Sequence, residues 1–265
     1  MQDTPFLTVI VPTHKRPTLL RRTLLSIKEQ AFQRVQVIVV SDARDLPTVE
    51  VCHELLGPQD IFVRRGGVPG PSQSRNLALD LAQGQYVMFI DDDDAYEGGA
   101  FEQIHRWLTS HRIDVAFFNC TVVHERREGG QPIFQSESAL DLAGRYSEDI
   151  YVKNSIHMST IAFPRHRLAG VRFDPHMRAY EDWDFMLAAM KQAQVAHVPL
   201  AATRVHEVHD ETTDRRGAST AAKDYNAVID YLYVYRRHPA PSPATQEKRR
   251  QLLLSCKLDV PTYCL

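Results

Sequence analysis

Cysteine is scarce in this sequence, and its spacing excludes the common cysteine-based architectures. The 265 residues include four cysteines, none of them in a C-x-x-C pair: Cys52, Cys120, Cys256 and Cys264. A disulfide framework or a structural zinc site needs cysteines that are denser or more closely paired. We therefore expect free thiols in a reducing, cytoplasmic setting, and no structural zinc.

The sequence also lacks an excess of positive charge and a long hydrophobic run. Its formal net charge is −2, which gives no support for a nucleic-acid partner. No stretch approaches the roughly 20 apolar residues that cross a bilayer. The first apolar run, within MQDTPFLTVIVPTHK, follows no basic leader and ends at Pro12. We interpret this run as a first strand rather than a signal peptide.

Strand and helix patterns alternate over the first 95 residues. The strand patterns cover residues 6–11, 35–40, 61–64 and 86–90, and the helix patterns begin at 17, 48 and 73. Ser72 is the expected cap of the third helix, and Gly84 follows its end. This alternation predicts a parallel sheet with helices on its faces, whose ligands bind beyond the carboxyl ends of the strands. Polar residues at 13–16, 41–42 and 91–94 follow three strands and should converge on one crevice.

The second half of the chain is less regular. We expect strands at 115–123, 159–163 and 195–198, helices at 181–191 and 221–238, and a turn or mobile loop at 125–131. A Pro-rich linker at 238–244 precedes TQEKRRQLLLSCK, which has the pattern of a basic amphipathic helix. This last helix either touches an anionic membrane or packs on the domain. The Tyr-rich stretch 231–237 is either a homodimer face or part of the core.

Four consecutive aspartates, Asp91 to Asp94, follow the apolar run that ends at Ile90. One or two aspartates at a strand end are typical of a turn. Four like charges need neutralisation, and a hard divalent cation provides it. Mg²⁺ is commonly held by one or two carboxylates together with substrate phosphates. The run therefore predicts a metal site at the end of a strand.

Three further motifs carry candidate chemistry, each with a structural alternative. GPSQSRNLAL at 70–79 places Gly70 and Arg75 around a helix start, which suits an anion or is a plain loop-to-helix junction. Asp42 ends a strand, as a ligand-binding acid or as a turn residue. Asp182 begins a helix, as a general base or as a dipole-stabilising acid.

Two histidines, His206 and His209, lie three residues apart in RVHEVHDE. Either could supply an imidazole ligand to the crevice, and either could be an ordinary surface or core residue. Zinc hydrolysis is disfavoured because the sequence has no H-E-x-x-H helix.

Taken in order, these motifs resemble family 2 glycosyltransferases of the GT-A fold. The elements that carry the resemblance are VIVPTHKR, VVSD, SRNLAL, YVMFIDDDD and YEDWDF. The resemblance implies an α/β fold with a Rossmann-like, mostly parallel central sheet flanked by helices. It also implies a nucleotide-sugar-binding half at 1–97, an acceptor-side half at 98–218 and a C-terminal helical extension at 219–265.

The resemblance also assigns roles to single residues. It places His14 against the base, Asp42 in a hydrogen bond to the base, Arg75 on the base or phosphates, and Asp91 on the ribose or sugar side. The whole nucleotide-sugar-binding set is Pro12, Thr13, His14, Arg16, Asp42, Arg75, Asp91 and Asp92. Asp93 and His206 become the metal ligands, with Asp94 and His209 as alternatives, and a one-residue register change would exchange the aspartate roles. Asp182 becomes the catalytic base of an inverting reaction.

The implied activity is metal-dependent sugar transfer from a nucleotide-diphosphate sugar, usually UDP-linked, to a hydroxyl acceptor. The implied cofactor is Mn²⁺ or Mg²⁺, and the implied acceptor is a saccharide or a lipid-linked saccharide in polysaccharide or glycolipid synthesis. Such an enzyme would be cytoplasmic or peripheral at the inner face of the membrane. Two alternatives are a sugar-phosphate nucleotidyltransferase and a non-catalytic binding subunit of the same fold. Residues 124–157 are a candidate mobile lid.

Overall fold

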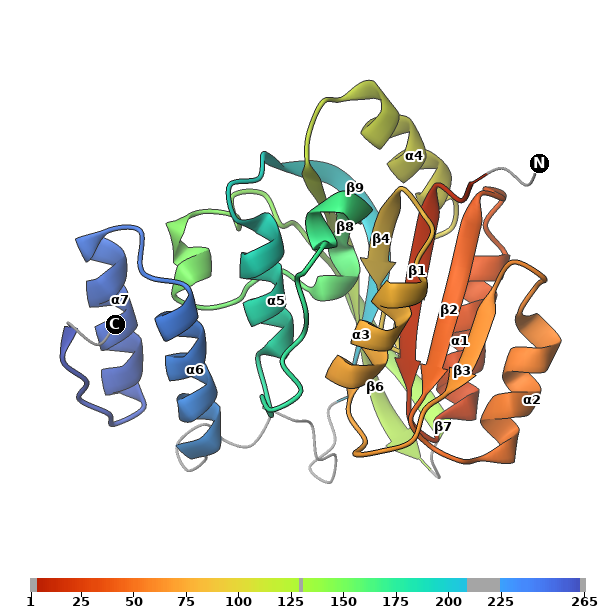
Figure 1. The fold of residues 1–265 in the computed structure, drawn as a ribbon, viewed down its shortest axis with the longest axis horizontal. Coiled ribbons are helices and arrows are strands. Elements are labelled where there is room, and N and C mark those ends of the chain that lie inside the picture. The colour runs from red at the N-terminus through yellow and green to blue at the C-terminus, as the bar shows by residue number, and fades with distance from the viewer. Residues whose placement is uncertain (1–3, 129–130, 209–224, 263–265) are drawn as a thin grey trace.

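The described part of the chain forms a mixed sheet covered by helices (Figure 1). A computed structural model describes residues 4–128, 131–208 and 225–262. The strands are β1 (Leu7–Thr13), β2 (Val35–Ser41), β3 (Ile61–Arg64), β4 (Tyr86–Phe89), β5 (Ala95–Tyr96), β6 (Val115–Glu128), β7 (Gln131–Leu140), β8 (Ile161–Pro164) and β9 (Val195–Val208). Their order in the sheet is β3-β2-β1-β4-β8-β6-β9-β5, and β7 pairs with β6.

The first four strands are parallel, as the sequence predicts. β1 pairs with β2 and with β4, and β2 pairs with β3, always in the parallel sense. Every residue of β1 and β2 is buried, because helices cover both faces of this part of the sheet. The carboxyl ends of β1, β2 and β4 therefore lie at one edge.

The helices are α1 (Pro17–Lys28), α2 (Leu46–Leu55), α3 (Pro71–Leu81), α4 (Ala100–Ser110), α5 (Glu181–Met190), α6 (Tyr225–Arg237) and α7 (Pro243–Ser255). Three short 3₁₀ helices also occur among the described residues: η1 (Glu148–Tyr151), η2 (Met158–Thr160) and η3 (Arg165–Leu168). The prediction that Ser72 caps the third helix is wrong. Gly70 is the residue before this helix and makes no side-chain cap, and Ser72 is a buried residue inside it. Pro71 can begin the helix because the first turn leaves its missing N–H unused.

The second half contains two strands that are longer than the sequence predicts. β6 continues to Glu128 and β7 begins at Gln131, so the turn expected at 125–131 is wrong for residues 125–128 and 131, while 129–130 lie outside the described residues. β9 extends ten residues beyond the expected end at Val198, to Val208. The extension of β9 pairs with β6, and where both strands exceed the prediction His124 lies opposite Glu207 and Glu125 opposite Val208. Polar residues in these extensions break the apolar pattern by which a strand is recognised in a sequence. Pairing with a distant strand stabilises the extensions instead.

The C-terminal helices pack at one end of the molecule, beside α5 (Figure 1). Arg249 of α7 is fully buried and donates hydrogen bonds to the carbonyls of Tyr151 (2.8 Å) and His238 (2.7 Å). This burial supports the interpretation of the last helix as a packing helix. In the Tyr-rich stretch, Tyr235 is buried, whereas Tyr233 is half exposed.

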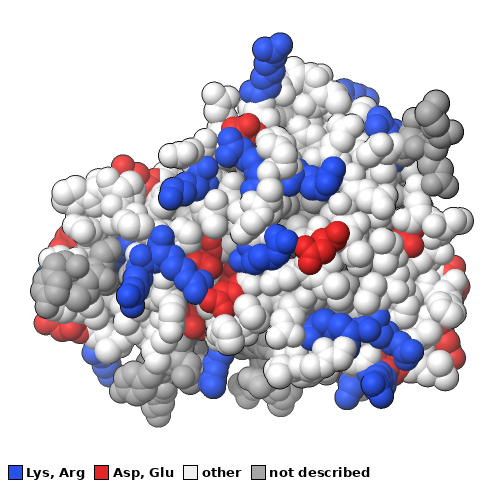
Figure 2. All heavy atoms as spheres, in the orientation of Figure 1, with Lys and Arg blue, Asp and Glu red and all other residues white. Residues whose placement is uncertain are grey.

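The apolar character of the helices and the distribution of surface charge are two further features of the molecule. In the part of the chain that the structure describes, no helix has the length and apolar character needed to span a membrane. Figure 2 shows Lys and Arg side chains in several separate groups on the face drawn, with Asp and Glu side chains between them. The positive charge on this face is thus distributed rather than gathered.

Candidate active site

A pocket with a volume of about 830 Å³ opens at the carboxyl ends of β1, β2 and β4. The strand ends that the sequence predicts to converge all contribute to it. Residues of the later chain form the opposite side. The lining residues include Pro12, Thr13, His14, Arg16, Asp42, Arg75, Asp91 to Asp94, Arg127, Asn154 to Ser159, Arg178 to Asp182 and Val205 to Val208. His209 lies outside the described residues.

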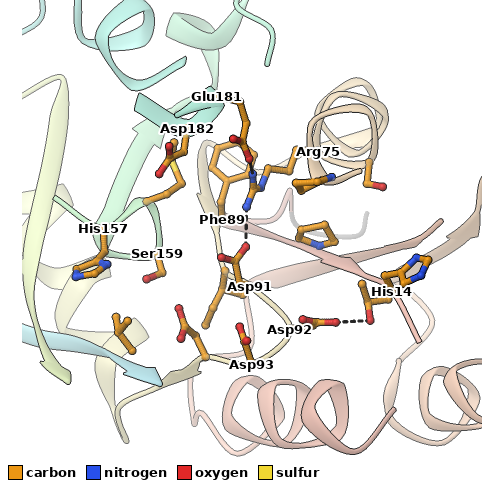
Figure 3. Close-up of a pocket in the computed structure, with 18 of the residues that line it drawn as sticks. His14, Arg75, Phe89, Asp91, Asp92, Asp93, His157, Ser159, Glu181 and Asp182 are labelled. Carbon is orange, nitrogen blue, oxygen red and sulfur yellow. Dashed lines mark hydrogen bonds and ion pairs between the residues drawn. The ribbon is translucent and has the colours of Figure 1, made fainter. Parts of the chain in front are cut away.

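The four aspartates alternate between two environments. The side chain of Asp91 is 56% exposed and that of Asp93 is 23% exposed. Asp92 and Asp94 are buried. Figure 3 shows Asp91 near the centre of the pocket, while Asp92 accepts a hydrogen bond from Thr13 at the end of β1. The run therefore presents two carboxylates to the pocket and keeps the other two within the protein.

Asp92 is held by the end of β1 and by the residue that precedes α1. The Thr13 hydroxyl donates to Asp92 at 2.7 Å, and Arg16 Nη1 lies 3.1 Å from both Asp92 and Asp93. Burial raises the pKa of Asp92 to about 6, although the charge of Arg16 opposes this shift. Arg16 thus reduces the repulsion between neighbouring carboxylates.

Asp94 connects the aspartate run to β9. Its carboxylate accepts a hydrogen bond from the backbone N–H of His206 at 2.9 Å. Burial raises the pKa of Asp94 well above its usual value, and the nearby charges of Asp93 and Asp91 raise it further. Asp94 therefore fixes the position of the β9 strand that carries His206.

Glu125 of β6 orients the imidazole of His206. Nδ1 of His206 lies 2.8 Å from the Glu125 carboxylate, which also accepts from Arg22 Nη1 at 2.6 Å. Burial, followed by the charge of Arg22, lowers the pKa of His206 and favours the neutral ring. Because a carboxylate only accepts, Nδ1 carries the ring proton and Nε2 carries the lone pair. Sequence reasoning missed Glu125, which falls in the segment expected to be a turn.

Arg22 links this histidine to the aspartate run. Its Nη2 donates to the backbone carbonyl of Asp93 at 2.5 Å, while its Nη1 binds Glu125. A single guanidinium of α1 thus contacts the backbone of one predicted metal ligand, Asp93, and the carboxylate that orients the other, His206.

Asp42 has protein partners on both carboxylate oxygens. One oxygen lies 2.5 Å from His14 Nδ1, and the other accepts from the N–H of Gly70 at 2.6 Å. Arg65 approaches the second oxygen at 3.4 Å. Asp42 therefore holds the glycine-rich loop before α3 at the edge of the pocket. The predicted contacts of Asp42 and His14 with a base remain predictions.

Arg75 of α3 lies between the two sides of the pocket. It is buried, and its guanidinium binds Asp91 at 2.6 Å and Glu181 at 3.3 Å. Burial alone would lower the pKa of Arg75, but the carboxylates of Asp91, Glu181 and Asp182 together raise it. Arg75 therefore stays charged and connects the aspartate run to the start of α5.

Asp182 lies in the first turn of α5 and faces the pocket with Glu181 (Figure 3). One of its oxygens accepts from the N–H of Trp183 at 2.7 Å. Burial raises the pKa of Asp182, and the positive charge of Arg75 opposes this shift. A carboxylate whose pKa is raised is a stronger base than an ordinary aspartate, which suits proton abstraction.

The remaining wall contains polar residues that sequence reasoning missed. Asn154, Ser155, His157 and Ser159 line the pocket, and Figure 3 shows His157 and Ser159 on the side away from His14. Burial lowers the pKa of His157. The alternation of polar residues with Ile156 and Met158 is the one sequence pattern that marks this segment.

The pocket fits a divalent cation that shares its coordination with a ligand. Among the described residues, no group of three or more His, Cys, Asp or Glu side chains forms a ready site. Asp91 and Asp93 nevertheless expose carboxylate oxygens to the pocket, and His206 lines it. Hard cations that complete their shell with phosphate oxygens need only one or two such carboxylates.

Comparison with known proteins agrees with this geometry. Residues 8–158, more than half of the chain, match the family described as Glycosyl transferase family 2. The chain is 34% identical over 124 residues to GalNAc(5)-diNAcBac-PP-undecaprenol beta-1,3-glucosyltransferase of Campylobacter jejuni. That alignment covers 46% of this chain and 40% of the relative.

Two solved structures show the fold. The first is Staphylococcus aureus TarS 1–349 in complex with UDP-GlcNAc, with a TM-score of 0.66, 19% identity, and coverage of 93% of this chain and 71% of that one. The second is the mannosyltransferase PcManGT from Pyrobaculum calidifontis in complex with GDP-Man and Mn²⁺, with a TM-score of 0.61 and 18% identity. That match covers 97% of this chain and 71% of the other. The predicted GT-A fold is confirmed.

Proposed function

This chain belongs to glycosyl transferase family 2, and we propose that it transfers a sugar from a nucleotide-diphosphate sugar to a hydroxyl acceptor, inverting the anomeric carbon. One observation carries the proposal most strongly. The exposed carboxylates of Asp91 and Asp93 share a pocket with Asp182. Burial raises the pKa of Asp182. This is the arrangement that donor binding and proton abstraction both require.

The donor side of the proposal concerns residues at the ends of β1, β2 and β4. Pro12, Thr13, His14, Arg16 and Asp42 would surround the nucleotide, while Asp91 and Asp92 would lie toward the ribose and sugar. UDP is the proposed nucleotide, as the family resemblance implies, and the TarS complex with UDP-GlcNAc supports this choice. The PcManGT structure was solved with GDP-Man, so GDP-sugars belong in the same test. Binding of a base to Asp42 would require His14 to move from its position against that carboxylate.

The metal part of the proposal assigns Mn²⁺ or Mg²⁺ to Asp93 and His206, with Asp94 and His209 as alternatives. Such an ion, when bound, neutralises charge on a departing diphosphate. Glu125 holds His206 in the tautomer that a metal ligand needs. The burial of Asp94 and its hydrogen bond to the His206 backbone favour Asp93 over Asp94 as the ligand.

The chemical step is assigned to Asp182. Its carboxylate would accept the proton of the acceptor hydroxyl as that oxygen attacks the anomeric carbon from the face opposite the leaving group. Arg75 binds Asp91 on one side and Glu181 on the other, which keeps the two sides of the pocket in fixed relative positions. General-base assistance of this kind contributes roughly 10²–10⁴ in rate.

The acceptor is proposed to be a saccharide or a lipid-linked saccharide in polysaccharide or glycolipid synthesis. The name of the Campylobacter relative includes an undecaprenol-linked substrate, which supports the lipid-linked choice. An acceptor of this type would place the enzyme in the cytoplasm or at the inner face of the membrane. Peripheral membrane contact through α7 and a homodimer remain part of the proposal, as does the division into 1–97, 98–218 and 219–265.

A thermal-shift panel of nucleotide sugars tests the proposal. Each donor is added with and without Mn²⁺, because a bound ligand raises the apparent stability by mass action. We expect a UDP-sugar to raise Tm, and to do so only with the metal. Sugar release to water or to an added acceptor then reports turnover. Release of pyrophosphate from a nucleoside triphosphate and a sugar phosphate would instead identify a nucleotidyltransferase, and binding without turnover would indicate a binding subunit.

A further inference from the structure

The C-terminal helix α6 contacts the chain segment that leads into α5. Asp230 of α6 is buried, and its Oδ2 accepts hydrogen bonds from the backbone N–H groups of Arg178 (3.0 Å) and Ala179 (2.8 Å). Both of these residues line the pocket. A buried carboxylate that accepts two backbone N–H groups fixes the path of that backbone, because losing it would leave both donors unsatisfied.

The next residue, Tyr180, is held in a conformation that needs external support. Its φ is 63°, in the left-handed region that non-glycine residues rarely adopt. Its ring packs on Tyr231 of α6 with centroids 4.4 Å apart, and Tyr231 also packs on Trp183 at 5.4 Å. The helix that carries Asp182 therefore begins from a strained residue that α6 holds in place.

The other end of α6 contacts the first turn of α5. Arg237 Nη1 binds one oxygen of Asp184 at 2.8 Å, and His238 Nε2 lies 2.9 Å from the other. Asp182 thus sits between two anchored points, residues 178–180 before it and Asp184 after it. All of these anchors come from residues about 50 positions later in the chain.

The geometry points to α6 as the element that positions Asp182, with Asp230 as its principal positioning residue. This inference rests on the proposed function, because it assumes that Asp182 is the base. Asp230 is not among the described residues that line the pocket, so it acts through residues 178–180. A misplacement of about 1 Å in reacting groups can lower a rate by roughly 10²-fold, so the loss of the anchor should affect turnover more than donor binding.

Three variants of α6 test the positioning role. Asp230→Ala removes the acceptor of both N–H groups, whereas Asp230→Asn retains an oxygen that can accept them. Val234→Ala is the matched control, because Val234 is fully buried in α6 and takes no part in the hydrogen bonds and ring contacts described above. Hydrogen exchange of the peptide covering 176–184 reports the anchor. UDP release from UDP-GlcNAc with Mn²⁺ reports turnover, and Tm shifts by UDP with Mn²⁺ report nucleotide binding.

We expect Asp230→Ala to speed exchange at 178–179 and to lower UDP release roughly tenfold to hundredfold, with the UDP-dependent Tm shift retained. Asp230→Asn should restore most of the turnover, and Val234→Ala should lower Tm without the same loss. Unchanged exchange in Asp230→Ala, or an equal loss of turnover in Val234→Ala, would overturn the positioning role. If the wild-type protein turns over no nucleotide sugar, the proposed function fails, and the exchange data still decide whether Asp230 anchors the segment.

Discussion

The two walls of the pocket are constructed in different ways. The wall to which we assign the donor, here called the donor wall, consists of residues 12–14, 16, 42 and 91–94, which lie at or just beyond the carboxyl ends of β1, β2 and β4. The wall to which we assign the acceptor, here called the acceptor wall, consists of residues 154–159 and 178–182, which belong mainly to loops and helix starts. The sheet fixes the donor wall through its backbone pairing. Side chains of α6 anchor the part of the acceptor wall at residues 178–180.

Variants in the two walls should therefore differ in their effects on nucleotide binding and on turnover. Changes in the donor wall should act on the binding of the nucleotide and metal, because these residues face the predicted ligand. Changes in the acceptor wall or its anchors should act on turnover while leaving nucleotide binding intact.

The largest effect is expected at Asp182. Asp182→Asn keeps the oxygen that accepts from the Trp183 N–H but cannot take a proton from the acceptor. Turnover should fall by roughly 10²–10⁴, while the Tm shift produced by UDP-sugar and Mn²⁺ persists. Transfer assays and thermal shift measure the two quantities on the same preparation. If donor binding is lost as well, Asp182 belongs to the donor site and the comparison between the walls fails.

The next effect is expected at Asp93, where the donor wall meets the predicted metal. Asp93→Asn should weaken Mn²⁺-dependent UDP binding by more than the roughly 10–100-fold typical of losing an outer-shell partner. EDTA should have the same effect on the wild-type protein. Calorimetric titration of UDP with and without Mn²⁺ measures both results.

Asp92→Asn is the matched comparison, because Asp92 is buried and bonded to Thr13 and Arg16. It should weaken UDP binding less than Asp93→Asn does and should leave the dependence of that binding on Mn²⁺ intact. A dependence on Mn²⁺ that is lost in Asp92→Asn and kept in Asp93→Asn would exchange the roles of the two aspartates.

A smaller effect is expected at Glu125, which lies outside both walls and orients His206. Glu125→Gln removes the charge that selects the Nδ1–H tautomer, so Mn²⁺ affinity in the presence of UDP should fall about tenfold. Electron paramagnetic resonance of free Mn²⁺ measures this affinity. Glu137→Gln is the control, because Glu137 is an exposed carboxylate on the neighbouring strand β7. Equal affinities in the two variants would remove Glu125 from the metal site.

The smallest effect concerns the pH dependence of turnover, which Asp182 of the acceptor wall sets. Burial raises the pKa of Asp182. Turnover should therefore be lost as Asp182 takes up a proton, at a pH above the roughly 3.9 at which an ordinary aspartate does so. The raised pKa also means that the folded state favours the protonated group. Its contribution to stability is therefore present below the unfolded pKa and lost as pH rises through the folded one.

Asp182→Asn should thus be more stable than the wild type at neutral pH, with a higher Tm. The gain in the free energy of unfolding should be about 1.4 kcal/mol for each tenfold increase in proton affinity that folding gives the Asp182 carboxylate. Thermal melts at several pH values, without ligand, measure this difference. A variant that is less stable than wild type at neutral pH contradicts the raised pKa.

Much of the donor wall could be predicted from the sequence. Apolar runs such as VQVIVV indicate buried parallel strands, and polar residues at their ends must lie at one edge of the sheet. The long strands β6 and β9 could not be predicted to their full length. Their polar ends are stabilised by pairing with each other, as at His124 and Glu207, and pairing leaves no trace in a local pattern.

The sequence by itself determined the parallel half of the sheet, the convergence of three strand ends and the identity of the acids there, because apolar runs mark buried strands and a helix between two of them makes the pair parallel. Only the tertiary structure decided which aspartates face the pocket, that Glu125 orients His206, and that Asp230 anchors the segment before Asp182. Those outcomes depend on contacts between residues far apart in the chain, where hydrogen bonds and burial select one arrangement that neither segment specifies alone.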